Sequence, residues 1–194
     1  MKYLFKIVIT CLFALGCVLP SYSDEDYNDI KKDIIALYNS NNLQDAYLLI
    51  AKVPEEERDA QLWLILANIT QDYGKDLDAV FLLQKAISKN PTYSKAYYNL
   101  ANLYLKDGRY LPAINNYQLA IKNDKTFPYA HYNLGIAYYK DNQYKKAKSS
   151  FLQAIKLKSN EPNFYYNLAL TYKKLNNNKM AEKALNSYNH LTKS

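Results

Sequence analysis

Three short phrases rich in tyrosine and asparagine recur along the chain and hold the residues best suited to binding. They read YYNLANLY at 97–104, HYNLGIAY at 131–138 and YYNLALTY at 165–172. Tyrosine rings can stack on bases, line a peptide site or fill a core, and asparagine carries a donor and an acceptor on a short arm. The phrases therefore allow three interpretations: nucleic-acid binding, peptide binding and packing.

The other chemistry-bearing residue types give little support to catalysis. The chain has two histidines, His131 and His190, and two cysteines, Cys11 and Cys17, both near the N-terminus. His131 occupies a repeated position that is otherwise aromatic, which favours a packed ring. The four glycines are isolated, so no glycine-rich phosphate loop is present, and no cluster has the spacing of metal ligands. We predict that the protein is not an enzyme and has no cofactor, no metal and no small-molecule substrate.

The tyrosines of each phrase fall at helical spacing. Tyr97, Leu100, Ala101 and Tyr104 stand at i, i+3, i+4 and i+7, which is one stripe of an α-helix. KDGR at 106–109 interrupts this helix. A second stripe then follows at Ala113, Tyr117 and Ala120. The pattern predicts a helix, a tight turn and a second helix, with small residues allowing close approach and tyrosines filling the space around them.

This unit repeats with a period of 34 residues. One repeated position holds leucine four times, at Leu66, Leu100, Leu134 and Leu168. Another holds alanine four times, at Ala79, Ala113, Ala147 and Ala181. An uninterrupted period of this length is typical of stacked helical repeats. The pattern predicts four units, at 60–93, 94–127, 128–161 and 162–194.

The spacing and residue types of the unit resemble the tetratricopeptide repeat. The resemblance implies an all-α protein, a right-handed solenoid (an α-α superhelix) of helix-turn-helix units whose first helices line a concave groove. The sequence departs from the family pattern at Thr70, where tyrosine is usual, and at Lys125 and Ser159, where proline is usual. Residues 24–59 are expected to form an acidic N-terminal helical hairpin, either a degenerate capping repeat or a separate hairpin packed on the array.

The helical register and the resemblance together place a second set of residues in the groove. The set comprises Asn68, Tyr98, Asn102, Leu105, Tyr132, Ile136, Tyr139, Tyr166 and Leu170. A column at the groove's edge consists of Asn99, Asn133 and Asn167. These asparagines could hydrogen-bond an extended peptide backbone, or they could brace the neighbouring helix. Lys106, Lys140 and Lys174 recur at the end of each first helix, where they could contact an acidic partner or complement the helix dipole.

The first 23 residues have the features of a secretory signal peptide. Lys2 and Lys6 precede an apolar run at 7–19, which is too short for a comfortable membrane span. We expect cleavage after Ser23; ALGC at 14–17 leaves lipidation of Cys17 as an alternative, and an uncleaved anchor as another. Each of these places the body of the protein in the periplasm or outer cell envelope of a bacterium. Membrane association is expected only if Cys17 is lipidated or the segment is retained.

Charge is distributed unevenly along the chain. Residues 24–59 hold ten acidic and four basic residues, a net charge of −6, whereas residues 60–194 hold eight acidic and 19 basic residues, a net charge of +11. A basic body favours acidic partners, although solvated helix faces also explain it. We expect a non-catalytic cell-envelope scaffold that binds an extended segment of a partner protein, with an acidic segment as one option. The alternatives are a self-assembling structural component and, against the predicted export, a basic aromatic groove for nucleic acid.

Overall fold

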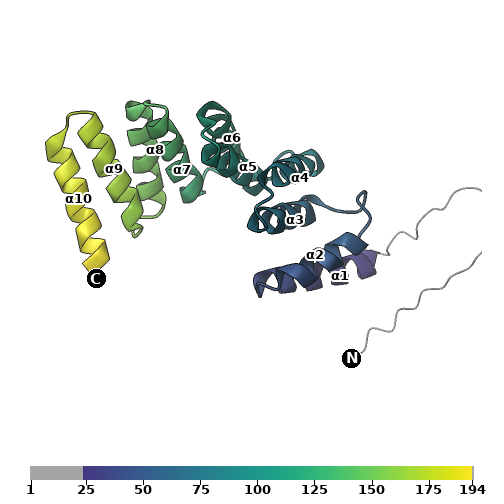
Figure 1. The fold of residues 1–194 in the computed structure, drawn as a ribbon. Helices are drawn as coiled ribbons and strands as arrows, with labels where there is room; N and C mark the ends of the chain where they lie inside the picture. Colours follow the sequence, from purple (N-terminus) through teal and green to yellow (C-terminus); the bar gives the residue numbers. More distant parts are fainter. Residues whose placement is uncertain (1–23, 194) are drawn as a thin grey trace, which may run out of the picture.

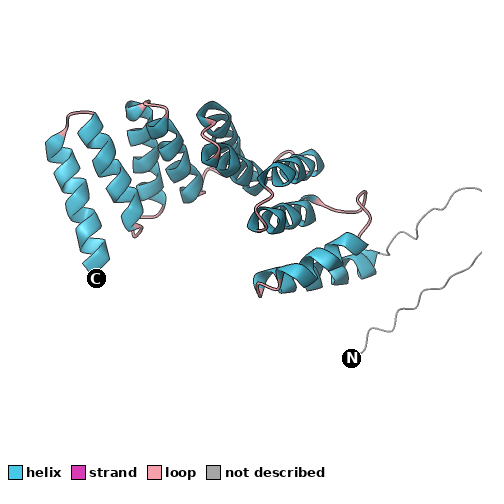
Figure 2. Ribbon diagram, in the orientation of Figure 1, coloured by secondary structure: helices cyan, strands magenta, loops and turns pink. Residues whose placement is uncertain are grey.

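The computed structural model describes residues 24–193, which form ten α-helices arranged as five antiparallel pairs (Figures 1 and 2). The helices are α1 (Asp24–Asn39), α2 (Leu43–Lys52), α3 (Ala60–Asp72), α4 (Asp76–Lys89), α5 (Ser94–Lys106), α6 (Tyr110–Asn123), α7 (Pro128–Lys140), α8 (Tyr144–Leu157), α9 (Pro162–Lys174) and α10 (Asn178–Lys193). The predicted all-α class and its helix-turn-helix pairs are confirmed. The predicted signal peptide, with Cys17, lies outside the described residues.

The pairs stack side by side along a curved path, from α1 at one end to α10 at the other (Figure 1). Each second helix also packs on the first helix of the next pair. None of the helices in residues 24–193 has the length and apolar character needed to cross a membrane.

The turn inside each pair is set by one residue in the left-handed backbone conformation. This residue is Asn41, Gly74, Gly108, Asn142 or Asn176, with φ between 56° and 75°. Glycine has no Cβ to oppose a positive φ, and asparagine tolerates it better than most residues. At Gly74 the reversal is held by the N–H of Lys75, which donates to the carbonyl of Thr70 at 3.1 Å. The tight turns therefore keep the two helices of each pair antiparallel.

Helix starts are marked by proline or by a capping side chain. Pro128 and Pro162 are the first residues of α7 and α9, where a missing N–H costs little. At the start of α3, Asp59 Oδ1 accepts hydrogen bonds from the N–H groups of Gln61 and Leu62, both at 3.0 Å. This cap also fixes where the link from α2 joins the following pair.

Small residues allow the two helices of a pair to approach, as the sequence predicts. The recurring alanines Ala79, Ala113, Ala147 and Ala181 are buried. Large side chains from the second helices, such as fully buried Tyr117 and Phe151, fill the space beside them. At Gly135 the approach leaves no room for a side chain, because a Cβ atom would lie only 2.6 Å from Cε1 of Phe151. Glycine at this position is therefore explained by the aromatic ring that faces it.

The structure corrects the prediction that Tyr97 belongs to the core stripe. Leu100 and Ala101 are buried, and Tyr104 is partly buried against the core, but Tyr97 is only half-buried and reaches back along the chain. Its hydroxyl donates to the carbonyl six residues earlier, Pro91 O, at 3.2 Å. The equivalent bonds run from Tyr165 to Ser159 O at 2.9 Å and between His131 Nε2 and Lys125 O at 3.2 Å. In three repeats, the side chain at this position therefore hydrogen-bonds the backbone of the link that precedes its helix.

Candidate functional site

The predicted groove residues lie on the first helices α3, α5, α7 and α9, which hydrogen bonds connect in series. Asn99 Nδ2 donates to Asn68 Oδ1 at 2.7 Å, and Asn133 Nδ2 donates to Asn102 Oδ1 at 2.9 Å. Each bond joins a first helix to the first helix of the preceding repeat. The side-chain amides of these asparagines therefore brace the array, as one of the two sequence interpretations proposes.

Tyrosine hydroxyl groups take part in the same network. Asn133 Nδ2 donates to the hydroxyl of Tyr98 at 3.0 Å, and Asn167 Nδ2 donates to that of Tyr132 at 2.6 Å. Both pairs are 35 residues apart, so the same bond is made twice between successive repeats. At the N-terminal end Asn68 Nδ2 donates to the hydroxyl of Tyr38 at 3.0 Å, which connects α1 to α3.

The rings of Tyr98 and Tyr132 lie in the seams between repeats. The ring of Tyr98 is 4.7 Å from that of Phe127, and the ring of Tyr132 stacks on Phe164 at 4.6 Å between centroids. Burial raises the pKa of both tyrosines, and the hydrogen bonds from asparagine oppose this effect. Both side chains are therefore protonated at neutral pH, and each hydroxyl keeps a hydrogen that it can donate.

The network leaves a regular set of hydrogen-bonding groups unused. Each of Asn99, Asn133 and Asn167 donates through its Nδ2, and within residues 24–193 its Oδ1 accepts no hydrogen bond. The hydroxyl hydrogens of Tyr98 and Tyr132 likewise have no acceptor in the described part of the chain. Successive repeats thus carry one open acceptor and one open donor.

The remaining groove residues differ in how open they are. Tyr166 is 42% exposed, with its ring 5.4 Å from that of Tyr188. Tyr139 is partly buried and packs edge-on against Tyr144. Asn102 accepts a second hydrogen bond, from the hydroxyl of buried Tyr117 at 2.6 Å. The three aliphatic members are partly buried; they are Leu105, Ile136 and Leu170. Tyr166 is therefore the most exposed tyrosine of the predicted set.

The three recurring lysines have different environments. Lys106 Nζ pairs with Asp76 Oδ2 of the preceding repeat at 2.6 Å. The residues at the Asp76 position in the next two repeats are Tyr110 and Tyr144, which offer no carboxylate. Lys140 and Lys174 are exposed and form no ion pair within residues 24–193. Of the three, Lys140 and Lys174 are the ones open to an acidic partner.

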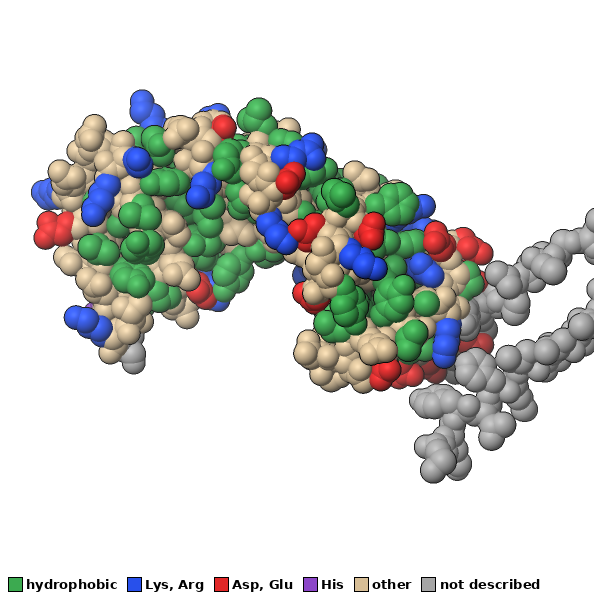
Figure 3. Space-filling view, in the orientation of Figure 1, with side chains coloured by type: hydrophobic (Ala, Val, Ile, Leu, Met, Phe, Trp, Pro, Cys, Tyr) green, Lys and Arg blue, Asp and Glu red, His purple; other side chains and the backbone are tan. Residues whose placement is uncertain are grey.

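An apolar groove between α2 and the α3–α4 pair was not predicted from the sequence. Exposed side chains line it, namely Tyr47, Leu48, Tyr73 and Phe81, with exposed fractions of 45% to 57%. Its cavity volume is about 760 Å³. Figure 3 shows apolar side chains gathered over this part of the molecule. The signal in the sequence is Phe81, which lies off the buried stripe of α4, together with Tyr73 directly after the end of α3.

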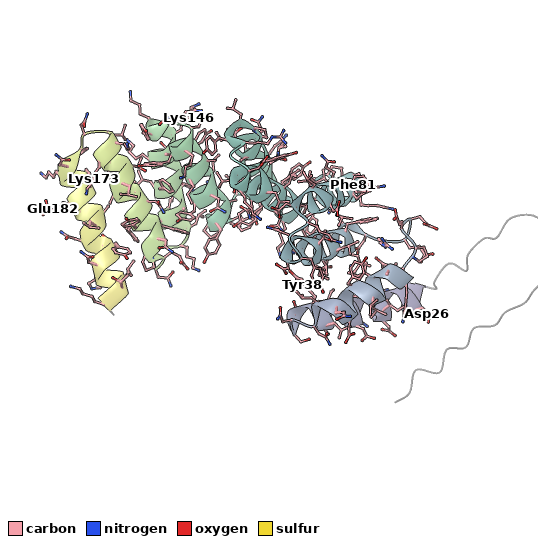
Figure 4. All side chains as sticks on the ribbon, viewed as in Figure 1. Asp26, Tyr38, Phe81, Lys146, Lys173 and Glu182 are labelled. Atoms are coloured by element: carbon pink, nitrogen blue, oxygen red, sulfur yellow. The ribbon has the colours of Figure 1, made fainter. Side chains whose placement is uncertain are left out.

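The described side chains (Figure 4) contain no metal centre. Within residues 24–193, no three His, Cys, Asp or Glu side chains come together in a way that could hold a metal ion.

Comparison with protein families finds matches in the middle part of the chain. A family model described as a tetratricopeptide repeat matches residues 82–114, and one described as a TPR repeat matches residues 102–142 and 137–176. Residues 82–176 therefore match tetratricopeptide repeat models, and the described residues have the paired-helix fold of such repeats. Proteins of this class are typically non-catalytic, and their fold suggests protein–protein interaction.

Among solved structures, the chain is similar to those of MamA. The structure titled "MamA 41-end from Desulfovibrio magneticus RS-1" shares 18% identity at a TM-score of 0.77, with 88% of this chain and 97% of that chain covered. The "Crystal structure of MamA" shares 22% identity at a TM-score of 0.74, with 81% and 93% covered. Likeness at this identity shows the fold alone. No curated protein matches the sequence.

Proposed function

We propose that the first helices bind an extended segment of a partner protein and that the chain acts as a non-catalytic scaffold. The observation that carries this proposal is the pair of open groups on successive repeats. A peptide unit has one N–H and one C=O to satisfy. The Oδ1 atoms of Asn99 and Asn133 suit the N–H groups of such a segment, and the hydroxyl hydrogens of Tyr98 and Tyr132 suit its carbonyls.

Packing of the tyrosine rings favours a peptide over bases. Nucleic-acid binding on a tyrosine surface needs rings whose faces are available for stacking. Tyr132 already stacks on Phe164, and the ring of Tyr98 packs against Phe127. Their hydroxyl groups can still form hydrogen bonds. Such bonds can bind a polypeptide backbone with little dependence on the side chains of the segment.

We further propose that the bound segment is acidic near one end and that the protein works in a bacterial cell envelope. Lys140 and Lys174 end two of the first helices without an intramolecular acid in the described part of the chain, so they can attract carboxylates of the segment. The envelope location is supported by the charged start and apolar run that precede Ser23.

The test is site-specific photocrosslinking of the full chain in cells that produce it. A photoreactive phenylalanine derivative replaces Tyr166 on a first helix or, as the control, Leu152 on a second helix. Both side chains are 42% exposed, so the two probes meet solvent equally. We expect protein adducts at position 166 and none at position 152. The further change Asn133→Ala should reduce these adducts by removing an open acceptor.

Three outcomes would contradict the proposal. Equal adducts at 152 and 166 would show that the first helices have no special role. An adduct with the mass of two copies would indicate self-assembly instead, and ribonuclease-sensitive adducts would indicate a nucleic-acid surface.

A further inference from the structure

Six lysines gather at one edge of the last two repeats, where the first helix of each pair turns into the second. This lysine edge consists of Lys140, Lys145, Lys146, Lys173, Lys174 and Lys179, all of them exposed. The turns between α7 and α8 and between α9 and α10 lie at the same end of the stacked pairs (Figure 1). Figure 4 shows Lys146 and Lys173 toward this end.

The positive charge is specific to these two repeats. Residues 139–146 and 173–180 hold six lysines and one acid, Asp141, a net charge of +5. The equivalent stretches of the two preceding repeats, residues 71–78 and 105–112, hold three basic and four acidic residues, a net charge of −1. The repeat architecture itself therefore does not require lysine at these positions.

Helix stability does not explain half of the lysine edge. Lys140, Lys173 and Lys174 end their helices, where a cation complements the helix dipole. Lys145, Lys146 and Lys179 instead occupy the first turns of α8 and α10, where the dipole disfavours positive charge. The first turn of α4 carries Asp76 and Asp78 in the same place, and α8 and α10 have no acid there.

The lysine edge is also left without charge partners. None of its six lysines forms an ion pair with any residue in the described part of the chain. At the equivalent edge of the earlier repeats, Lys106 pairs with Asp76. On the lysine edge, the ammonium group of Lys146 lies 5.4 Å from the ring centre of Tyr138, which is a contact with a ring and not with an acid. The unpaired charges at the lysine edge are therefore available to a negatively charged partner.

We propose that the lysine edge docks the protein on an anionic phospholipid membrane. The edge contains lysine and no arginine, so it presents strongly hydrated point charges instead of the flat fork that reads single phosphates. The charges lie on an outer edge that a flat surface can meet, and each lysine near an anionic bilayer adds to the attraction.

Single-stranded nucleic acid fits this edge less well, because such binding combines a groove with stacking aromatic rings. The tyrosines beside the edge are already engaged. Tyr138 is buried beneath the ammonium group of Lys146, and Tyr139 packs against Tyr144.

Docking through the lysine edge would also orient the molecule. Residues 24–59, at the other end of the array, carry a net charge of −6 and would be repelled by the same surface. Lys140 and Lys174 belong to both proposals, so a docked membrane and an acidic end of the bound segment would compete for these two lysines. The groups proposed to bind the backbone of the segment, on Tyr98, Asn99, Tyr132 and Asn133, are not part of the lysine edge, so membrane docking does not depend on partner binding.

The test is co-sedimentation of the purified full chain with vesicles of phosphatidylglycerol or of phosphatidylcholine. We expect binding to phosphatidylglycerol that weakens with added salt, because screening shortens the reach of surface charge. The fourfold variant Lys145→Gln, Lys146→Gln, Lys174→Gln and Lys179→Gln should lose about 100-fold or more of the salt-sensitive binding. Any salt-insensitive contribution of the N-terminal apolar run is common to all variants.

A matched control changes the same number of charges elsewhere. Lys75, Lys95, Lys122 and Lys125 are exposed, and their replacement by Gln should leave most of the binding in place. Conversion of the four edge lysines to arginine should also retain it, because the charge is kept. Circular dichroism of each variant establishes that it is folded.

Equal losses in the edge and control variants would overturn the proposal, since net charge alone would then explain binding. A second outcome would also overturn the proposal. If the protein bound single-stranded RNA in a salt-sensitive way, lost that binding in the edge variant and did not bind phosphatidylglycerol vesicles, the partner of the lysine edge would be a nucleic acid and not a membrane. If the glutamine edge variant does not fold, the arginine edge variant and the glutamine control variant still test the proposal. Loss of binding in the folded arginine variant, or a large loss in the folded control variant, would contradict a charge-driven edge.

Discussion

The contact between Gly135 and Phe151 offers a sharp test of how the helices of a repeat pack. A Cβ atom built at Gly135 would lie 2.6, 2.7 and 3.0 Å from three atoms of the Phe151 ring. Favourable carbon–carbon contacts are about 3.5–4.0 Å, so the ring would have to move by about 1 Å. Phe151 is only 1% exposed and has little room to do so.

The expected effect of Gly135→Ala is the difference between two opposing terms. Alanine in a helix interior is favoured over glycine by about 1 kcal/mol. Overpacking a filled core costs about 1–3 kcal/mol. We therefore expect a net loss of about 1 kcal/mol in the free energy of unfolding, with the clash outweighing the gain in helix propensity.

The companion change Phe151→Leu separates the two terms. Leucine occupies the same repeated position at Leu83 and Leu185, and it lacks part of the ring that the added methyl group would meet. In this background Gly135→Ala should become stabilising by up to about 1 kcal/mol, which gives a coupling of about 1–3 kcal/mol. Urea unfolding of the four proteins, followed by circular dichroism, measures the coupling. Stabilisation by Gly135→Ala to the same extent in both backgrounds would refute the packing described for α7 and α8.

Two further predictions concern the links between repeats. Burial lowers the pKa of His131, so the unfolded chain takes up a proton at higher pH than the folded chain does, and stability falls as pH drops below the ordinary histidine value of about 6.5. His131→Tyr, which installs the residue found at positions 97 and 165, should make thermal melting less sensitive to pH below about 6.5; an unchanged pH profile would contradict this account. Asp59→Ala should lower the free energy of unfolding by about 1–2 kcal/mol in urea titrations, because it removes the α3 cap and the ion pair with Lys31. Asp59→Asn, which keeps a capping oxygen, should retain most of this stability, and an equal loss in both variants would show that the cap is not the cause.

Some features of the site could be read from the sequence and others could not. Helical spacing and the 34-residue period predict that Tyr98 and Asn133 lie on the first helices of successive repeats. Their hydrogen bond does not follow from these features, because it joins residues 35 apart and depends on how closely α5 and α7 approach. The same limit applies to Lys106, Lys140 and Lys174, which occupy equivalent positions in the sequence. Only the residue at the Asp76 position, brought close by stacking, distinguishes Lys106 from the other two.

Helical spacing also could not rank the tyrosines by burial. Tyr97 lies on the predicted core stripe but is half-buried and bonds to the preceding link, whereas Tyr98 lies beside the stripe and packs between repeats. A stripe gives the direction of a side chain on its own helix. What a long side chain with a polar tip contacts is decided by the neighbouring repeat.

The sequence by itself determined the all-α class and the helix-turn-helix unit, because both follow from local physics: apolar spacing, small residues at fixed positions, and glycine or asparagine where the backbone reverses. It also determined the uneven charge along the chain. The tertiary structure decided which hydrogen-bonding groups remain open and which lysines remain unpaired. Those properties depend on distances between side chains of neighbouring repeats, which no single repeat contains.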